Sequence, residues 1–228
     1  MTLPAPVQRR SVGSRLFETV VVVVVALGVA ALVRAFVVQA FFIPSGSMEN
    51  TLLPDDRIAV SKLDLLFGDV QRGDVVVFRD PGGWLGQRPA STNPIRQALE
   101  FVGVAPSSTE GDLVKRVIGV GGDEVACCDR QGRVTVNGTP LDEDYLYPGD
   151  MPSVEEFDVT VPQGYLWVMG DHRSASDDSR AQPQATQFVP EDHVIGRAFL
   201  VFWPFDRWDL LQRPATFADV PDQPDRSR

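Results

Sequence analysis

Lysine is almost absent from this sequence. Of its 21 basic residues, 19 are arginine, and the two lysines are Lys62 and Lys115. The difference matters because a lysine amine can lose its proton inside a protein, whereas an arginine guanidinium stays charged. Two surface lysines could also persist by chance. The composition therefore singles out Lys62 and Lys115 as the two positions where a neutral amine could do chemistry.

Histidine is equally scarce, since the chain has only His172 and His193. A Ser-His-Asp triad would need one of them beside a nucleophilic serine. His172 lies in a polar stretch over residues 170–180, and His193 lies in a turn that precedes an apolar run. Both are interpreted as loop residues, which disfavours a triad.

The two cysteines, Cys127 and Cys128, are adjacent. A trans peptide sets neighbouring Cα atoms about 3.8 Å apart, below the roughly 4.4–6.8 Å usual for a disulfide. No spacing typical of a metal site is present. We interpret them as two strand or turn residues, with a strained or intermolecular disulfide as the alternative.

Acidic residues outnumber basic residues, 31 to 21. The net charge is −10 and the pI about 4.6, so nucleic acid is not expected as a partner. The first 39 residues nevertheless hold four arginines and one acidic residue, whereas the remainder holds 17 basic and 30 acidic residues. A basic N-terminal segment followed by an acidic remainder is typical of a protein whose first segment lies at a membrane.

The chain has one long uncharged apolar run, from Thr19 to Val33. As a helix, its 15 residues cover about 22 Å, less than the roughly 30 Å hydrocarbon layer. Arg34 can snorkel, however, and the apolar residues after it extend the helix. A cleaved secretory signal and a retained anchor are both open. We favour the anchor because no small-x-small cleavage site is clean, and arginines upstream place the N-terminus in the cytoplasm.

Downstream of this run the pattern is β. Asn137-Gly138 predicts a tight hairpin turn. Outside the anchor we expect no long amphipathic helix, and no repeat is evident. Residues 81–111 are rich in Gly, Pro, Ser and Asn, typical of an insertion or flap. The predicted strands are 57–62, 74–78, 113–118, 133–136, 165–169 and 194–203.

The segment Phe41–Leu52 places a Ser-Gly-Ser tripeptide between apolar residues, directly after the anchor. A serine can be activated by a neutral lysine, whose pKa must be lowered by an apolar environment. Lys115 fits because it lies in an apolar strand, next to an arginine. Lys62 is the weaker candidate, since Asp64 would hold its amine charged.

Three stretches together resemble the signature boxes of bacterial type I signal peptidases. Their order, their spacing and the preceding anchor also match, so the resemblance spans about residues 17–204. Two positions depart from the family pattern: Gly121 stands where proline is usual, and His172 where asparagine is usual. The stretches are Ile43-Pro44-Ser45-Gly46-Ser47-Met48 with Thr51-Leu52; Lys115-Arg116-Val117-Ile118-Gly119 with Gly122-Asp123; and Gly170-Asp171 through Ser176, Asp178, Ser179 and Arg180.

The resemblance implies a role for each matching residue. Ser47 would be the nucleophile and Lys115 the general base, with Ser176 hydrogen-bonded to the lysine. The Ser47 N–H and the Ser45 hydroxyl would form the oxyanion hole. An ion pair of Asp178 with Arg180 would support the loop that carries Ser176. Further structural support is expected from Asp171, Arg173 and Arg116, and apolar substrate subsites from Phe41, Ile43, Met48, Leu52, Leu113 and Val114.

It also implies the architecture: a single transmembrane helix followed by a mainly β catalytic domain of coiled antiparallel sheets, barrel-like in form. The expected regions are a cytoplasmic tail (1–16), an anchor (17–39), an extracytoplasmic catalytic domain (40–212) with a flap (81–111), and a disordered acidic tail (213–228). The expected location is the plasma membrane.

The implied activity is a serine endopeptidase that removes signal peptides after an Ala-x-Ala site. Its partners would be secretory preproteins, membrane lipid and the nearby export translocon, with no cofactor and no metal. Two alternatives are weighed against it. A self-cleaving regulator of related fold would need a DNA-binding segment and an Ala-Gly cleavage loop, and the chain has no Ala-Gly pair. A non-catalytic, membrane-anchored β module is the other.

Overall fold

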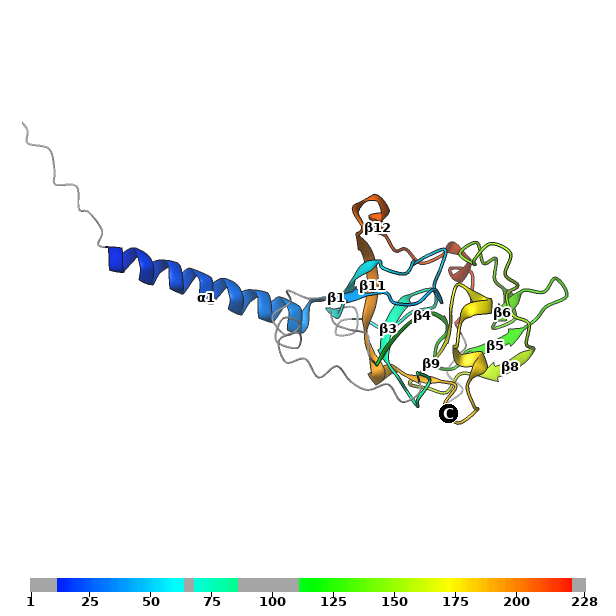
Figure 1. Ribbon diagram of the computed structural model, residues 1–228. Coiled ribbons are helices and arrows are strands. Elements are labelled where there is room, and N and C mark those ends of the chain that lie inside the picture. The colour runs from blue at the N-terminus through cyan, green and yellow to red at the C-terminus, as the bar shows by residue number, and fades with distance from the viewer. Residues whose placement is uncertain (1–11, 64–67, 86–110, 223–228) are drawn as a thin grey trace, which may run out of the picture.

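The structure is a computed structural model that describes residues 12–63, 68–85 and 111–222 (Figure 1). Strands make up most of its regular structure. The elements are α1 (Val12–Phe36), β1 (Val38–Phe42), β2 (Arg57–Ser61), β3 (Val75–Arg79), β4 (Asp112–Gly119), β5 (Glu124–Cys127), β6 (Val134–Val136), β7 (Thr139–Pro140), β8 (Phe157–Thr160), β9 (Tyr165–Met169), η1 (Arg173–Ala175), η2 (Ser179–Ala181), β10 (Val189–Pro190), η3 (Glu191–His193), β11 (Val194–Trp203), η4 (Phe205–Arg207), β12 (Asp209–Leu210) and η5 (Ala215–Phe217).

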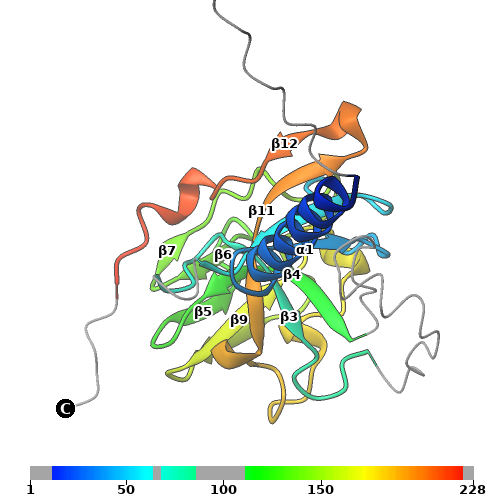
Figure 2. The same ribbon diagram turned by 90° about the vertical axis from the view of Figure 1, so that its left-hand side faces the viewer.

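The strands form two antiparallel sheets. The larger has the order β1-β2-β11-β3-β4-β9-β10, with β12 paired to β11, and the smaller has the order β7-β6-β5-β8. Viewed from the α1 side, the smaller sheet lies beside the larger one (Figure 2). The mainly β, antiparallel prediction is confirmed. The barrel-like closure is not seen among the described strands, because β1 and β10 end the larger sheet without pairing to each other.

All six predicted strands are present: 165–169 and 194–203 match in full, and the ends of the other four are shifted by one residue at most. The predicted hairpin is present too: Val136 pairs with Thr139 across Asn137-Gly138, and both turn residues have positive φ angles. That backbone suits the twist of a two-residue hairpin. Of the predicted flap, residues 86–110 lie outside the described part of the chain.

Helix α1 includes the predicted anchor up to Phe36, and Val38 already belongs to β1. It extends away from the sheets on the β1 side (Figure 1).

Within the described residues, the structure contains no helix whose length and apolarity suffice for crossing a membrane.

The C-terminal region differs from the predicted disordered tail over residues 213–222. Phe217 is buried against the core of the smaller sheet and stacks on Tyr145, with 6.3 Å between ring centroids, and Val220 is buried in the same cluster. Arg213 pairs with Asp74, the residue directly before β3. Two apolar side chains and one ion pair therefore hold this segment on the body, in spite of its acidic composition.

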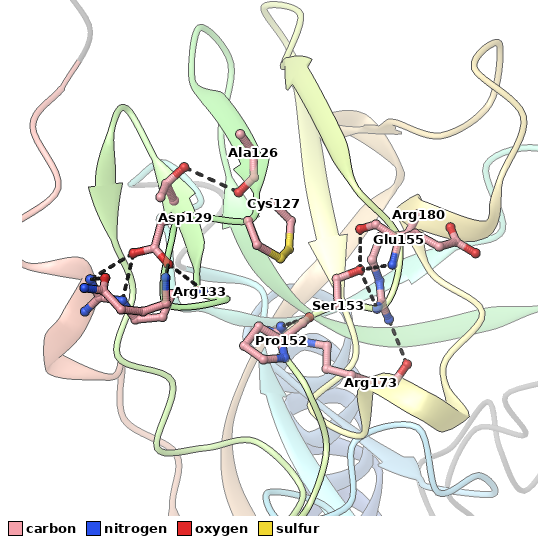
Figure 3. The surroundings of a disulfide bond; sticks show 12 residues. Ala126, Cys127, Asp129, Arg133, Pro152, Ser153, Glu155, Arg173 and Arg180 are labelled. Atoms are coloured by element: carbon pink, nitrogen blue, oxygen red, sulfur yellow. Dashed lines mark hydrogen bonds and ion pairs between the residues drawn. A yellow bond between two sulfur atoms is a disulfide. The ribbon is translucent and has the colours of Figure 1, made fainter.

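Cys127 and Cys128 are joined by a disulfide at the end of β5, beside the turn in which Arg133 donates a hydrogen bond to the Asp129 carboxylate (Figure 3). The peptide bond between the two cysteines is cis. Our preferred interpretation of two unbonded residues is thus corrected, and the alternative that it left open is the one observed.

Candidate active site

Ser47 lies at the start of a single turn anchored in the core. Glu49 N–H donates to the Gly46 carbonyl at 3.0 Å, and Leu52 N–H donates to the Met48 carbonyl at 2.7 Å. The side chains of Met48 and Leu52 are fully buried against β1 and β2. The buried side chains of Met48 and Leu52 hold the turn against the core, so the position of Ser47 is defined. Ser47 itself is only 9% exposed.

Lys115 lies in the middle of β4, paired with Val76 of β3. It is 3% exposed, and its Nζ lies 2.6 Å from Ser47 Oγ. Burial lowers the pKa of Lys115 from 10.5 to about 8, although the carboxylates of Asp178, Asp177 and Asp171 act in the opposite direction. A buried amine at hydrogen-bonding distance from a serine hydroxyl can accept its proton near neutral pH.

Arg116, the next residue, points to the opposite face of β4, as strand alternation requires. It donates to both carboxylate oxygens of Asp171, at 2.8 and 2.6 Å, and to the Gly73 carbonyl at 2.9 Å. Its guanidinium also lies over the Tyr145 ring. Burial opposes the charge, but Asp171 outweighs it and raises the pKa of Arg116. This bidentate pair ties β4 to the loop after β9.

The loop after β9 packs directly on the serine turn. A Cβ atom at Gly170 would collide with the Ser47 carbonyl oxygen and with Ser176, so the close approach requires glycine. Asp178 accepts the Gly170 N–H at 3.0 Å and pairs with Arg180 at 2.8 and 2.9 Å. The expected ion pair of Asp178 and Arg180 is therefore present, and Arg180 also donates to the Arg173 carbonyl (Figure 3).

Ser176 does not make the hydrogen bond expected of it. Its Oγ is buried and makes no hydrogen bond to Lys115 among the described residues, and the hydroxyl is one of the groups that lower the pKa of Asp178. The hydroxyl lies against Gly170, which in turn touches the serine turn. Ser176 is thus close to the Ser47 loop, and a role in orienting the lysine stays a proposal.

Asp171 and Arg173, which were expected to give structural support, are both buried and ion-paired. Asp171 pairs with Arg116 and accepts the Thr51 hydroxyl. Arg173 pairs with Glu143 and donates to the Pro152 carbonyl. Glu143 is a supporting residue that the motifs do not contain, because it lies outside all three stretches.

A cavity of about 120 Å³ opens beside Ser47 and Lys115. Four predicted subsite residues line it (Ile43, Met48, Leu113 and Val114), together with Ser45. The other two, Phe41 and Leu52, are fully buried core residues that do not line the cavity. Sequence reasoning missed three further lining residues: Pro44, Leu85 and Asp112.

Leu85 had no recognisable motif, because it lies within the predicted flap. Asp80 fixes it there by accepting the N–H groups of Gly82, Gly83, Trp84 and Leu85. Asp112 could have been suspected from its place three residues before Lys115. Burial raises the pKa of its carboxyl group.

The other candidates lie away from the reacting atoms. Lys62 follows β2 and does not line the cavity. In the part of the chain that the structure describes, no hydrogen bond joins His172 or His193 to the Ser47 hydroxyl, whose partner is Lys115. The geometry therefore assembles a serine–lysine pair.

Comparison with known proteins agrees with this arrangement. A family model described as "Signal peptidase, peptidase S26" matches residues 16–203. Signal peptidase I of Mycobacterium tuberculosis is 41% identical, with 92% of this chain and 78% of the relative covered. The probable signal peptidase I of Mycobacterium leprae is also 41% identical (86% and 78% covered), and the probable signal peptidase I-2 of Synechocystis is 38% identical (84% and 73%). The chain therefore belongs to the signal peptidase family, peptidase S26, and is a signal peptidase.

Proposed function

We propose that the protein removes signal peptides from secretory preproteins with Ser47 as nucleophile and Lys115 as general base. The observation that carries the proposal is the 2.6 Å separation of Lys115 Nζ and Ser47 Oγ in a buried environment, where the pKa of the lysine falls to about 8. A substantial fraction of such a lysine is neutral near pH 7–8, as a general base must be.

The neutral amine of Lys115 takes the proton of the Ser47 hydroxyl as Oγ bonds to the scissile carbonyl carbon. The carbonyl oxygen becomes an oxyanion, which accepts hydrogen bonds from the Ser47 N–H and the Ser45 hydroxyl. Collapse of this intermediate breaks the C–N bond, and the lysine ammonium returns its proton to the departing amine. Lys115 then takes a proton from water, whose oxygen bonds to the ester carbon. The C–Oγ bond breaks, the lysine ammonium returns the proton to Ser47 Oγ, and the signal peptide leaves with a free carboxyl group.

The substrate binds as an extended strand along β4. Residues 112–115 pair with β3, whereas pairing with β9 begins only at Arg116. In the described chain this leaves the second edge of Asp112–Lys115 open, so a peptide can add there by main-chain hydrogen bonds. The small cavity, with walls from Ile43, Met48 and Val114, suits alanine side chains before the cut and excludes larger ones.

The protein works at the plasma membrane, with its N-terminus cytoplasmic and its catalytic domain outside, close to lipid and to the export translocon. The valines of α1 are exposed, which is unfavourable in water and favourable in lipid. Trp203, Phe205 and Trp208 are also exposed, and tryptophan is enriched at membrane interfaces. The arginines before the apolar run support this orientation.

The test is processing of a secretory preprotein by membranes of cells that express the full chain. Ser47→Ala and Lys115→Arg should each remain in the membrane pellet, and each should lower the cleavage rate by about 10³-fold or more. Ser45→Ala should lower it by about 10²–10³-fold, because one oxyanion donor is lost.

Lys62→Arg is the matched control and should process normally, since this lysine does not line the cavity. A Lys115→Arg variant of near-normal activity would rule out a lysine base. Equal losses for Ser45→Ala and Ser47→Ala would show that their roles are misassigned. Recovery of the wild type in the soluble fraction would rule out the anchor.

A further inference from the structure

We infer that His172 is a positioning residue that aims the oxyanion-binding N–H of Ser47 through the Gly46 carbonyl group. The inference rests on the proposed roles of Ser47 as nucleophile and oxyanion donor. It assigns a task to a residue that does not touch the reacting hydroxyl.

His172 contacts the serine turn at two points. Its backbone N–H donates to the Ser47 carbonyl at 3.1 Å, and its ring Nδ1 lies 3.2 Å from the Gly46 carbonyl oxygen. Nδ1 also lies 3.2 Å from a carboxylate oxygen of Glu49. Both ring partners are acceptors, so the tautomer that satisfies them carries its proton on Nδ1.

One face of the imidazole ring packs on Tyr147. The two rings stack with 3.9 Å between centroids and an interplanar angle of 15°. Tyr147 is held in turn, because its N–H donates to the Asp171 carbonyl at 3.0 Å. The imidazole is therefore clamped between Tyr147 and the serine turn.

The Gly46 carbonyl and the Ser47 N–H belong to one peptide group. Because that group is planar and trans, its C=O and N–H point in opposite directions. The Gly46 oxygen also accepts the Glu49 N–H at 3.0 Å, and the hydrogen bond from His172 holds it at a second point, which helps to set the direction of the Ser47 N–H. The same bond polarises the peptide and strengthens the N–H as a donor.

Removal of the His172 hydrogen bond should therefore lower kcat and leave KM unchanged. The oxyanion exists only in the transition state and the intermediate, so a misaimed donor weakens binding there and not in the ground state. The loss should be smaller than for removal of a donor, since the Ser47 N–H remains present.

Two variants separate the ring's shape from its hydrogen bond. His172→Phe keeps the ring and its stacking on Tyr147 but has no donor, and we expect kcat to fall about tenfold with KM unchanged within twofold. His172→Asn loses the ring but places an amide N–H near the position of Nδ1, and kcat should recover to within about threefold of wild type. His193→Phe is the matched control and should leave both constants unchanged.

A second readout uses a peptide boronate, which forms a tetrahedral adduct on serine, and an uncleavable substrate analogue. His172→Phe should weaken boronate binding about tenfold and leave the analogue's affinity unchanged. The inference fails if kcat is unchanged, if only KM rises, if His172→Asn is as impaired as His172→Phe, or if boronate affinity does not move. A loss as large as that of Ser47→Ala would overturn it in favour of a histidine base. The proposed function fails separately, if Ser47→Ala itself retains activity.

Discussion

Lys115 and Arg116 are neighbours on β4 and are buried to nearly the same extent, at 3% and 2% exposure, yet their surroundings differ in kind. The Arg116 guanidinium meets the carboxylate of Asp171, a carbonyl oxygen and an aromatic ring. The Lys115 amine meets the Ser47 hydroxyl. One face of the strand, here called the compensated face, pairs its buried charge with a bonded carboxylate. On the other, here called the uncompensated face, carboxylates act only from a distance and burial outweighs them.

The two faces therefore divide structure from chemistry. An arginine paired with a carboxylate stays charged and ties β4 to the loop after β9. Burial of an amine without a directly bound carboxylate lowers its pKa, which raises the fraction of the neutral form that accepts a proton. Alternation along a strand allows both environments within two residues, because successive side chains point to opposite faces.

The largest effect is expected on the compensated face. Arg116→Met should lower the free energy of unfolding by about 3–5 kcal/mol, because it leaves the Asp171 carboxylate buried without its cation. Chemical denaturation of the purified full chain measures this. Arg133→Met is the matched control, since that arginine pairs with Asp129 at the surface, and its midpoint should barely change. Equal midpoints for the two variants would show that the Arg116 network contributes little.

The next effect concerns the protonation of Lys115, on the uncompensated face. Since Lys115 must be neutral and its pKa is about 8, kcat/KM should fall about tenfold for each pH unit below 8 and level off above it. Arg116 keeps its charge throughout this range and should add no break of its own. A pH–rate profile of preprotein cleavage measures this. A rate that stays flat down to about pH 6 would contradict a lysine base with this pKa.

The smallest effect is the gain in folding stability expected when Lys115 is replaced by an apolar residue. The pKa of Lys115 is lower in the folded protein (about 8) than its ordinary value of 10.5, so the unfolded chain binds more protons between these values. Wild-type stability should therefore rise as the pH increases from 8 to 10.5. At pH 7 the buried ammonium costs about 3 kcal/mol, partly offset by its hydrogen bond to Ser47.

Lys115→Met should consequently be inactive but more stable than wild type by about 1–2 kcal/mol near pH 7, with the gain shrinking toward pH 10.5. Denaturation curves at several pH values test this. A variant less stable than wild type at pH 7 would show that the lysine is compensated after all.

The sequence was most informative where the cause is local. Lys115 stood out because its strand neighbours are apolar, and Ser47 because apolar residues flank it; the structure places their reactive atoms 2.6 Å apart. The three motifs also led to a family that the comparisons confirm, which sets aside the self-cleaving regulator and the non-catalytic module.

The sequence was least informative where partners lie far apart. Arg116 and Asp171 are separated by 55 positions, and Arg173 and Glu143 by 30, so no local pattern pairs them. Phe41 and Leu52 had the apolar character expected of a subsite, but packing assigns them to the core. Leu85, in contrast, was not expected at the site but lines the cavity, because the Asp80 carboxylate accepts its N–H and holds it there.

What the sequence determined by itself is the chemistry: one lysine in an apolar strand, one serine between apolar residues, and strands whose alternation follows from covalent geometry. What only the tertiary structure decided is compensation: which buried cation meets a carboxylate, and which backbone carbonyl meets His172. Side-chain character is set residue by residue, whereas the environment of a buried charge depends on groups 30 to 68 positions away that packing brings into contact.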